Sequence, residues 1–275
     1  MGILMAGLSP HPPIIIPEIG GRRREEVRST ISSLEELAKE IKALEPDLLI
    51  TISPHGPVFT DAISILDLEH IEGDFSDFAC PGIKMEVETN PGFIKRLKER
   101  AVEEGIEVIT LSSTELENYN LAARLDHGVL VPLYFLQKAG LNSPVIPITM
   151  GLLAYKKLYD FGLVIQQILE EMDINAVIIA SGDLSHRLKP GAPAGFNPRG
   201  KEFDERLIAL IKKEDYEAIL KLDTQLIEKA GECGLRPLII MLGSLRGLPF
   251  KPEVKSYEGP FGVGYAVIGF YPEED

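Results

Sequence analysis

The chain has 275 residues with a formal net charge of −14, from 42 acidic and 28 basic side chains, and two cysteines. This length can bury one sizeable core, and no linker interrupts it, so we expect a single domain over residues 1–275. The negative charge argues against nucleic acid or an anionic membrane surface as the main partner. Cysteines without a metal-binding spacing, no apolar run of membrane-spanning length and no signal pattern predict a reduced, cytoplasmic protein.

Apolar runs and helical spacings alternate along the chain. Strands are predicted at 3–8, 48–52, 62–68, 85–89, 106–111, 145–150, 176–180, 254–258 and 263–271. Helices are predicted at 22–44, 91–104, 129–139, 154–172, 201–213, 215–222 and 235–243. The proline-rich segment 9–21 is interpreted as a stiff loop, 71–81 as an irregular acidic stretch and 188–200 as an exposed loop. This order predicts a single three-layer α/β domain with a central mixed, mainly parallel sheet and helices on both faces.

The same tripeptide follows two of the predicted strands. Ser9-Pro10-His11 follows the first strand, and Ser53-Pro54-His55 follows the strand at 48–52. Parallel strands present their carboxyl ends at one edge of a sheet, where open α/β folds keep their ligand sites. Because imidazole is a common ligand of transition metals, His11 and His55 are the best candidate pair of metal ligands.

Two further histidines share this context, in which an apolar element meets a polar turn. His127 lies in Leu-Asp-His-Gly before an apolar helix, and His186 ends Ser-Gly-Asp-Leu-Ser-His after the strand at 176–180. A single histidine near a loop is more often a hydrogen-bonding group than a ligand. The shared context of all four predicts that they cluster, whereas His70 lacks it and is interpreted as a surface residue.

A carboxylate would complete a two-histidine metal site that leaves positions open for substrate and dioxygen. The candidates are Glu18, Asp61, Asp183 and Glu232. Glu232 is favoured because it lies in a glycine-containing loop that opens an apolar helix. The alternative for Glu232 is a charge in the first helical turn, stabilised by the helix dipole.

Together, the two Ser-Pro-His turns, Asp-His-Gly, Ser-Gly-Asp-Leu-Ser-His and the Gly-Glu helix start resemble the class III extradiol ring-cleavage dioxygenase superfamily, the family of the protocatechuate 4,5-dioxygenase catalytic subunit. The resemblance covers nearly the whole chain. It is strongest to the branch associated with AMMECR1 domains, and the chain is more distantly similar to the Memo proteins. No AMMECR1 domain is present in these 275 residues.

The resemblance implies a non-haem Fe(II) held by His11, His55 and Glu232, with zinc or another divalent metal as the alternative. It implies that His186 is the acid/base that takes a proton from a catechol hydroxyl, and that His127 assists substrate or oxygen binding. A neutral histidine is suited to this proton transfer at physiological pH.

Further residues of the same motifs are expected to contact the ligands or the substrate, namely Asp183, Asp126, Ser53 and Ser185. Asp183 and Asp126 are suited to orient His186 and His127 by hydrogen bonds, although Asp183 is equally suited to cap the turn after its strand. Cys233 directly follows Glu232 and is a softer candidate for the third ligand. Candidates for binding a substrate carboxylate are Arg124, Arg187 and Arg236.

The leading functional expectation is a metal-dependent extradiol-type dioxygenase that uses dioxygen to cleave a catechol-like or other small aromatic substrate. One alternative is a non-catalytic, Memo-like metal-binding scaffold with an AMMECR1 or radical SAM protein as partner. The other is a metal-dependent hydrolase, because the same ligands with zinc could activate water. His186 and Glu232 favour an enzyme over a scaffold. A homo-oligomer is plausible, and Cys80 is expected to be dispensable for activity.

Overall fold

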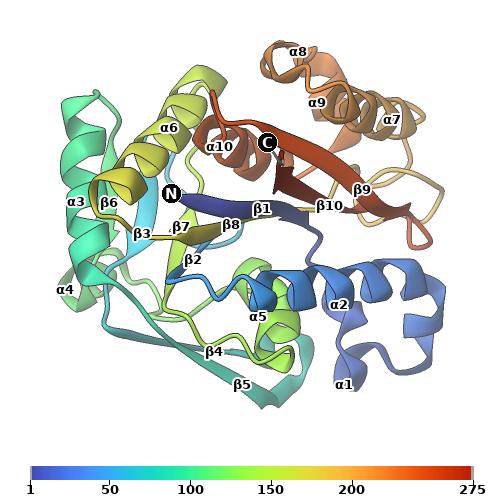
Figure 1. Ribbon diagram of the computed structural model, residues 1–275. Helices are drawn as coiled ribbons and strands as arrows, with labels where there is room; N and C mark the ends of the chain where they lie inside the picture. The colour runs from blue at the N-terminus through green and yellow to red at the C-terminus, as the bar shows by residue number, and fades with distance from the viewer. Residues whose placement is uncertain (1, 274–275) are drawn as a thin grey trace.

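A computed structural model of the chain describes residues 2–273 and contains a large central sheet (Figure 1). Its strand order is β6-β3-β7-β2-β8-β1-β10-β9. The strands are β1 (Ile3–Ser9), β2 (Leu48–Ser53), β3 (Ile63–Leu66), β6 (Val108–Leu111), β7 (Val145–Thr149), β8 (Ala176–Ser181), β9 (Phe250–Glu258) and β10 (Tyr265–Pro272). The neighbours β7, β2, β8 and β1 are parallel, whereas β3 runs antiparallel to β7 and the pair β9–β10 adds an antiparallel edge. The predicted mixed, mainly parallel sheet is confirmed.

Helices cover both faces of this sheet, as predicted (Figure 1). They are α1 (Pro17–Gly20), α2 (Arg28–Ala43), α3 (Pro91–Glu103), α4 (Ser113–Tyr119), α5 (His127–Lys138), α6 (Tyr155–Glu171), α7 (Arg199–Lys212), α8 (Tyr216–Leu220), α9 (Thr224–Ala230) and α10 (Leu235–Ser244). One face packs against α3, α6 and α10, and the other against α2 and α5. Within residues 2–273, no helix is both long and apolar enough to cross a membrane.

The two apolar cores explain why the central strands consist almost entirely of apolar residues. Along β8, Ile178 belongs to the core beneath α6 and α10, whereas Val177 and Ile179 belong to the core beneath α2 and α5. Successive side chains of a strand point to opposite faces, so a strand covered on both sides needs apolar residues at every position. The sheet is therefore packed on both faces, and the loops that carry the predicted site begin at its carboxyl edge.

The prediction of an irregular stretch at 71–81 is wrong. This segment belongs to a two-stranded antiparallel hairpin, β4 (His70–Phe75) and β5 (Cys80–Glu88), joined by a short 3₁₀ turn at Ser76–Phe78. Ile71 and Phe75 point into the core while polar residues alternate with them, which is the period of a strand. The acidic residues of this segment occupy the outer face of the hairpin and concealed that period.

Other elements also differ from the predictions. The segment 9–21 contains the short helical turns Pro13–Ile15 and α1, because prolines at the first helical position favour helix starts. The predicted helix 22–44 begins as a 3₁₀ helix, Gly21–Val27, and becomes α-helical only at Arg28. The short helices α4 and α9 were not predicted. The antiparallel C-terminal strands were predicted correctly.

Candidate metal centre and active site

Three neighbouring parallel strands bring the predicted histidines to one edge of the sheet. His11 follows β1, His55 follows β2, and His186 follows β8, which lies between those two strands. The fourth, His127, is the first residue of helix α5. Ring centroids lie 4.7 Å apart for His11 and His55, 5.2 Å for His11 and His127, and 4.2 Å for His55 and His127. The predicted cluster therefore exists at the carboxyl edge, whereas His70 lies exposed on β4.

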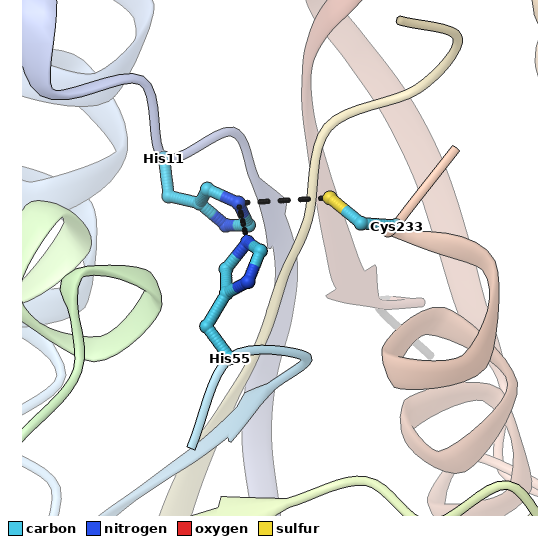
Figure 2. Close-up of side chains that lie close together, drawn as sticks. All are labelled: His11, His55 and Cys233. Carbon is cyan, nitrogen blue, oxygen red and sulfur yellow. Dashed lines mark hydrogen bonds between the residues drawn. The ribbon is translucent and has the colours of Figure 1, made fainter. Parts of the chain in front are cut away.

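A sulfur atom completes a three-donor group with two of these imidazoles (Figure 2). The Nε2 atoms of His11 and His55 lie 2.9 Å apart, and the Cys233 Sγ lies 3.6 Å from His11 Nε2. Tetrahedral coordination with metal–nitrogen bonds of about 2.0 Å and a metal–sulfur bond of about 2.3 Å separates two nitrogens by about 3.3 Å and nitrogen from sulfur by about 3.5 Å. The nitrogen–sulfur distance suits a divalent metal, the two imidazoles would have to separate by a few tenths of an ångström, and all three donor atoms lie within 4.8 Å of one another.

Both imidazoles are held neutral, as metal ligands must be. Burial lowers the pKa of His11 to about 3, despite the opposing charge of Asp183. Burial and the neighbouring His127 ring lower the pKa of His55 to about 4. At neutral pH each ring therefore has a nitrogen lone pair available for a cation.

A buried serine sets which nitrogen of His11 carries the proton. The Ser181 hydroxyl, at the end of β8, donates a hydrogen bond to the Gly128 carbonyl, and its oxygen lies 2.9 Å from His11 Nδ1. Because its own hydrogen is engaged, that oxygen accepts the Nδ1–H. This leaves the lone pair on His11 Nε2, the atom that faces His55 and Cys233. Sequence analysis did not identify Ser181 as a site residue.

Close backbone packing places Cys233 beside the histidines. A Cβ atom on Gly182, just after β8, would collide with the Gly234 backbone, so both glycines are needed for the two loops to touch. This contact lets the Asp183 amide donate to the Cys233 Sγ at 3.3 Å. Burial raises the pKa of the Cys233 thiol well above its ordinary value. The thiol is therefore protonated in the metal-free protein, and a metal bound to it would have to release that proton.

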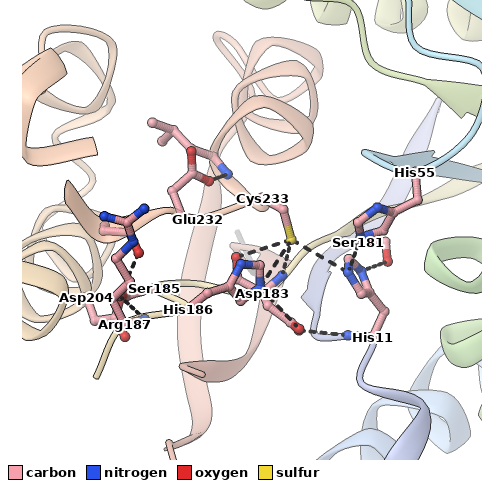
Figure 3. Close-up of polar contacts among 12 residues, drawn as sticks. His11, His55, Ser181, Asp183, Ser185, His186, Arg187, Asp204, Glu232 and Cys233 are labelled. Atoms are coloured by element: carbon pink, nitrogen blue, oxygen red, sulfur yellow. Dashed lines mark hydrogen bonds and ion pairs between the residues drawn. The ribbon is translucent and has the colours of Figure 1, made fainter. Parts of the chain in front are cut away.

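His186 and Asp183 form a carboxylate–imidazole pair beside this group (Figure 3). The His186 Nε2 lies 3.8 Å from Asp183 Oδ2 and 3.9 Å from the Cys233 Sγ. Burial alone would lower the pKa of His186, but the neighbouring Asp183 carboxylate outweighs it and raises that pKa. Asp183 also accepts the His11 backbone N–H at 3.0 Å. One carboxylate therefore contacts both the loop that carries His11 and the loop that carries His186.

The Glu232 carboxylate does not join the three-donor group. It turns toward the start of α10, where Oε2 accepts the Leu235 backbone N–H at 2.6 Å (Figure 3). Burial raises its pKa to about 7, with the Leu235 hydrogen bond and the Arg236 charge acting in the opposite direction. Glu232 lies two residues before the N-cap Gly234, so it caps the start of α10 from outside instead of lying in the first helical turn as the alternative had it. The role of Glu232 as a metal ligand stays a prediction. The other candidate acids, Glu18 and Asp61, are exposed.

Asp126 and Ser53 fix the helix that carries His127. The Asp126 carboxylate caps α5 by accepting the Gly128 N–H at 2.7 Å, and the Ser53 hydroxyl donates to the same oxygen at 2.6 Å. The Ser53 hydroxyl also accepts the His55 backbone N–H at 3.2 Å. These contacts connect the His55 and His127 loops through their backbones, rather than by the predicted hydrogen bond from Asp126 to the His127 ring.

Ser185, which directly precedes His186, is held by hydrogen bonds to neighbouring segments. Its hydroxyl donates to the Ala230 carbonyl at 2.9 Å, and its backbone N–H donates to Asp204 Oδ1 at 2.8 Å. Asp204 also accepts the Tyr257 hydroxyl at 2.7 Å, and burial raises its pKa to about 7. Sequence analysis missed Asp204, although an acid on the buried face of α7 was a usable signal.

An open cavity of about 310 Å³ adjoins the exposed side of the histidine cluster. The His55 and His127 side chains line it together with Phe78, whose ring lies 5.2 Å from that of His127. Of the candidate arginines, Arg124 lines this cavity. Arg236 instead donates to the Leu153 carbonyl at 2.6 Å. The hairpin that sequence analysis interpreted as irregular therefore supplies one wall beside the site.

A sheet edge with a His–His–Cys donor group, a carboxylate-backed histidine and an adjoining cavity defines a candidate metal-dependent active site. The chain matches the family described as the catalytic LigB subunit of aromatic ring-opening dioxygenase over residues 5–268. With this match across almost the whole sequence, the chain belongs to that family, as the resemblance of its motifs predicted.

Individual relatives fall into several groups. The chain is 40% identical over 261 residues to Protein CA_C1420 of Clostridium acetobutylicum, covering 95% of this chain but only 56% of that protein's length. It is 22% identical to 3,4-dihydroxyphenylacetate 2,3-dioxygenase of Escherichia coli, covering 88% and 89% of the two chains. It is 24% identical to the MEMO1 family protein MJ0403 of Methanocaldococcus jannaschii, covering 86% and 75%. An uncharacterized protein of Escherichia coli K12, JW3007, shares the fold with a TM-score of 0.63 at 15% identity, over 97% and 99% of the chains.

Proposed function

We propose that this protein binds a divalent metal ion, with Fe(II) as the leading candidate, through His11, His55 and Cys233, and uses it in extradiol-type oxygenation of a small aromatic substrate. The observation that carries this proposal is the meeting of three neutral donors beside a carboxylate-backed histidine and an open cavity. Membership of the ring-opening dioxygenase family and the similarity to 3,4-dihydroxyphenylacetate 2,3-dioxygenase support the class of reaction.

The chemistry of the donor set fits this role. Two histidines and one further ligand leave coordination positions free, and a bound Fe(II) would supply sites where a catechol and dioxygen can meet. Ser181 keeps the His11 Nε2 lone pair directed at the ion. His55 is the exposed member of the pair and lines the cavity, so a metal held by it would be accessible from that side.

The remaining site residues hold the substrate and move protons. His186, with its pKa raised by Asp183, takes a proton from a catechol hydroxyl and can return it later in the reaction. Burial lowers the pKa of His127, so its neutral ring provides a hydrogen-bonding edge beside the substrate. Phe78 closes the cavity next to His127 and offers an aromatic face for stacking.

A second candidate function follows from the sulfur ligand. A cysteine in place of the expected carboxylate favours softer or redox-active metals over a standard oxygenase site. Together with the similarity to MEMO1 family proteins, this supports a metal-binding protein that does not cleave aromatic rings. The expected AMMECR1 or radical SAM partner would belong to this second function.

Metal analysis combined with oxygen uptake separates the two candidates. Anaerobically purified protein is analysed for metal content, reloaded with Fe(II), and mixed with a panel of small catechols in an oxygen electrode. The dioxygenase proposal predicts iron near one equivalent and oxygen uptake with a coloured ring-fission product. Stoichiometric metal without uptake for any catechol would overturn it in favour of the metal-binding protein.

A further inference from the structure

The cavity beside the histidine cluster contains more negative than positive charge. Asp74, Asp77 and Asp126 line it with the single cation Arg124. The Asp126 carboxylate is turned to Ser53 and the start of α5, so Asp74 and Asp77 supply the charge toward the open side. A cleft lined mainly by one sign of charge concentrates ligands of the opposite sign.

The positive charge of Arg124 is already paired with a carboxylate of the protein. Its guanidinium donates to Asp77 Oδ2 at 2.8 Å, and both side chains are about half exposed. A substrate carboxylate approaching Arg124 would have to displace Asp77 or remain beside it. A guanidinium with its own counterion is therefore a poor anchor for an anion, although Arg124 was among the sequence candidates for that role.

The acidic side chains line the same cavity as two of the clustered histidines, His55 and His127. Asp77 lies in the same 3₁₀ turn as Phe78, and the Phe78 ring contacts the His127 ring. Asp77 and His127 both line this cavity. A ring bound between Phe78 and the histidines would therefore direct any substituent on its outer side toward Asp74 and Asp77.

Building on the proposed function, we propose that the substrate is a small aromatic compound whose side chain is uncharged or carries an amine, and that this pocket discriminates against a carboxylate side chain. Asp77 is the main specificity-determining residue. It supplies negative charge to the cavity and at the same time neutralises Arg124.

Two catechols of the same size test this inference, because dopamine and 3,4-dihydroxyphenylacetate differ chiefly in the charge of the side chain. Binding of each, and of uncharged 4-ethylcatechol, is measured by calorimetry on Zn²⁺-loaded full-length protein without oxygen. Dopamine should bind about fivefold more tightly than 3,4-dihydroxyphenylacetate at low salt, a modest ratio because the charges are partly exposed. Equal binding, tighter binding of the carboxylate, or no binding of any of the three would overturn the inference.

Two variants connect the preference to the charge pair. Asp77→Asn removes one negative charge and frees Arg124, so it should abolish or reverse the preference for dopamine. Arg124→Gln, the matched control on the other partner, should keep or increase it. An unchanged preference in Asp77→Asn would refute the role of Asp77. Calorimetry measures binding without turnover, so this inference and the dioxygenase proposal can fail separately. Absence of oxygen uptake in the electrode experiment would overturn the dioxygenase proposal and would not affect this inference.

Discussion

Replacing Glu232 by Gln provides a quantitative test of the site's electrostatics. The structure places this carboxylate in an enclosed position away from the His–His–Cys group, where Oε2 accepts the Leu235 N–H at 2.6 Å. Glutamine has nearly the same shape and keeps an oxygen for that hydrogen bond, but it cannot ionise. The substitution therefore removes the buried charge while changing little else.

The size of the effect follows from the pKa. Burial raises the pKa of Glu232 from its ordinary value of 4.5 to about 7. Each pKa unit corresponds to about 1.4 kcal/mol, so ionised Glu232 lowers the free energy of unfolding by about 3 kcal/mol at most. A carboxyl whose folded-state pKa is raised binds its proton more tightly in the native state. Stability is consequently lost as pH rises from about 4.5 to about 7, and the loss is constant above that range.

Urea unfolding of metal-free protein at pH 5, 6.5 and 8 measures this difference. Glu232→Gln should be more stable than the parent at pH 8 by up to about 3 kcal/mol, and the gain should shrink toward pH 5. A variant that is equally or less stable at pH 8 would refute the reasoning. The same variant should retain bound metal, and loss of metal would instead support the predicted ligand role of Glu232.

Three further substitutions test other parts of the account. Ser181→Ala should lower metal affinity by about tenfold or more, measured by chelator competition, because His11 loses its tautomer-fixing partner; unchanged affinity would refute that role. His186→Gln should keep the metal but reduce catechol-dependent oxygen uptake by about 100-fold, and normal uptake would exclude His186 as the acid/base. Lys255→Met should lower the free energy of unfolding by about 1–2 kcal/mol, because the buried ammonium bridges Glu36 and Glu40 at 2.8 and 2.9 Å; no change in urea unfolding would contradict this.

Sequence patterns predicted which edge of the sheet carries the histidines, because the residues that mark this edge are adjacent in the sequence. An apolar run ending in Ser-Pro-His fixes both the end of a strand and the position of an imidazole, so the sequence alone is enough to pair His11 with His55. The same reasoning placed His186 after β8, the strand between them. Strands buried on both faces are also recognisable as continuous apolar runs. These runs predicted the parallel strands at the centre of the sheet.

The identity of the third donor depends on contacts between distant segments. Glu232 and Cys233 are adjacent in sequence, and the orientation of their loop is set by the contact between Gly182 and Gly234, which no local pattern reveals. Asp204 likewise acts through Ser185, nineteen positions earlier in the chain. Both cases require knowledge of which loops pack together.

The cavity was missed for a related reason. Acidic residues on the exposed face of the β4–β5 hairpin obscured the alternation of its buried residues. Phe78, which borders His127, was therefore interpreted as part of an irregular acidic stretch. Cys80, two residues later, is partly buried against the core beneath the hairpin, and its dispensability for activity stays a prediction.

The most direct test of the central claim is the absorption spectrum of the Co²⁺-substituted protein. Cobalt bound by a thiolate gives a sulfur-to-metal charge-transfer band, which imidazole and carboxylate ligands do not give. If His11, His55 and Cys233 hold the metal, the band will appear in the parent and in Glu232→Gln and will be lost in Cys233→Ser. Cobalt binding without that band in the parent, or binding abolished by Glu232→Gln and preserved in Cys233→Ser, would contradict the proposed centre.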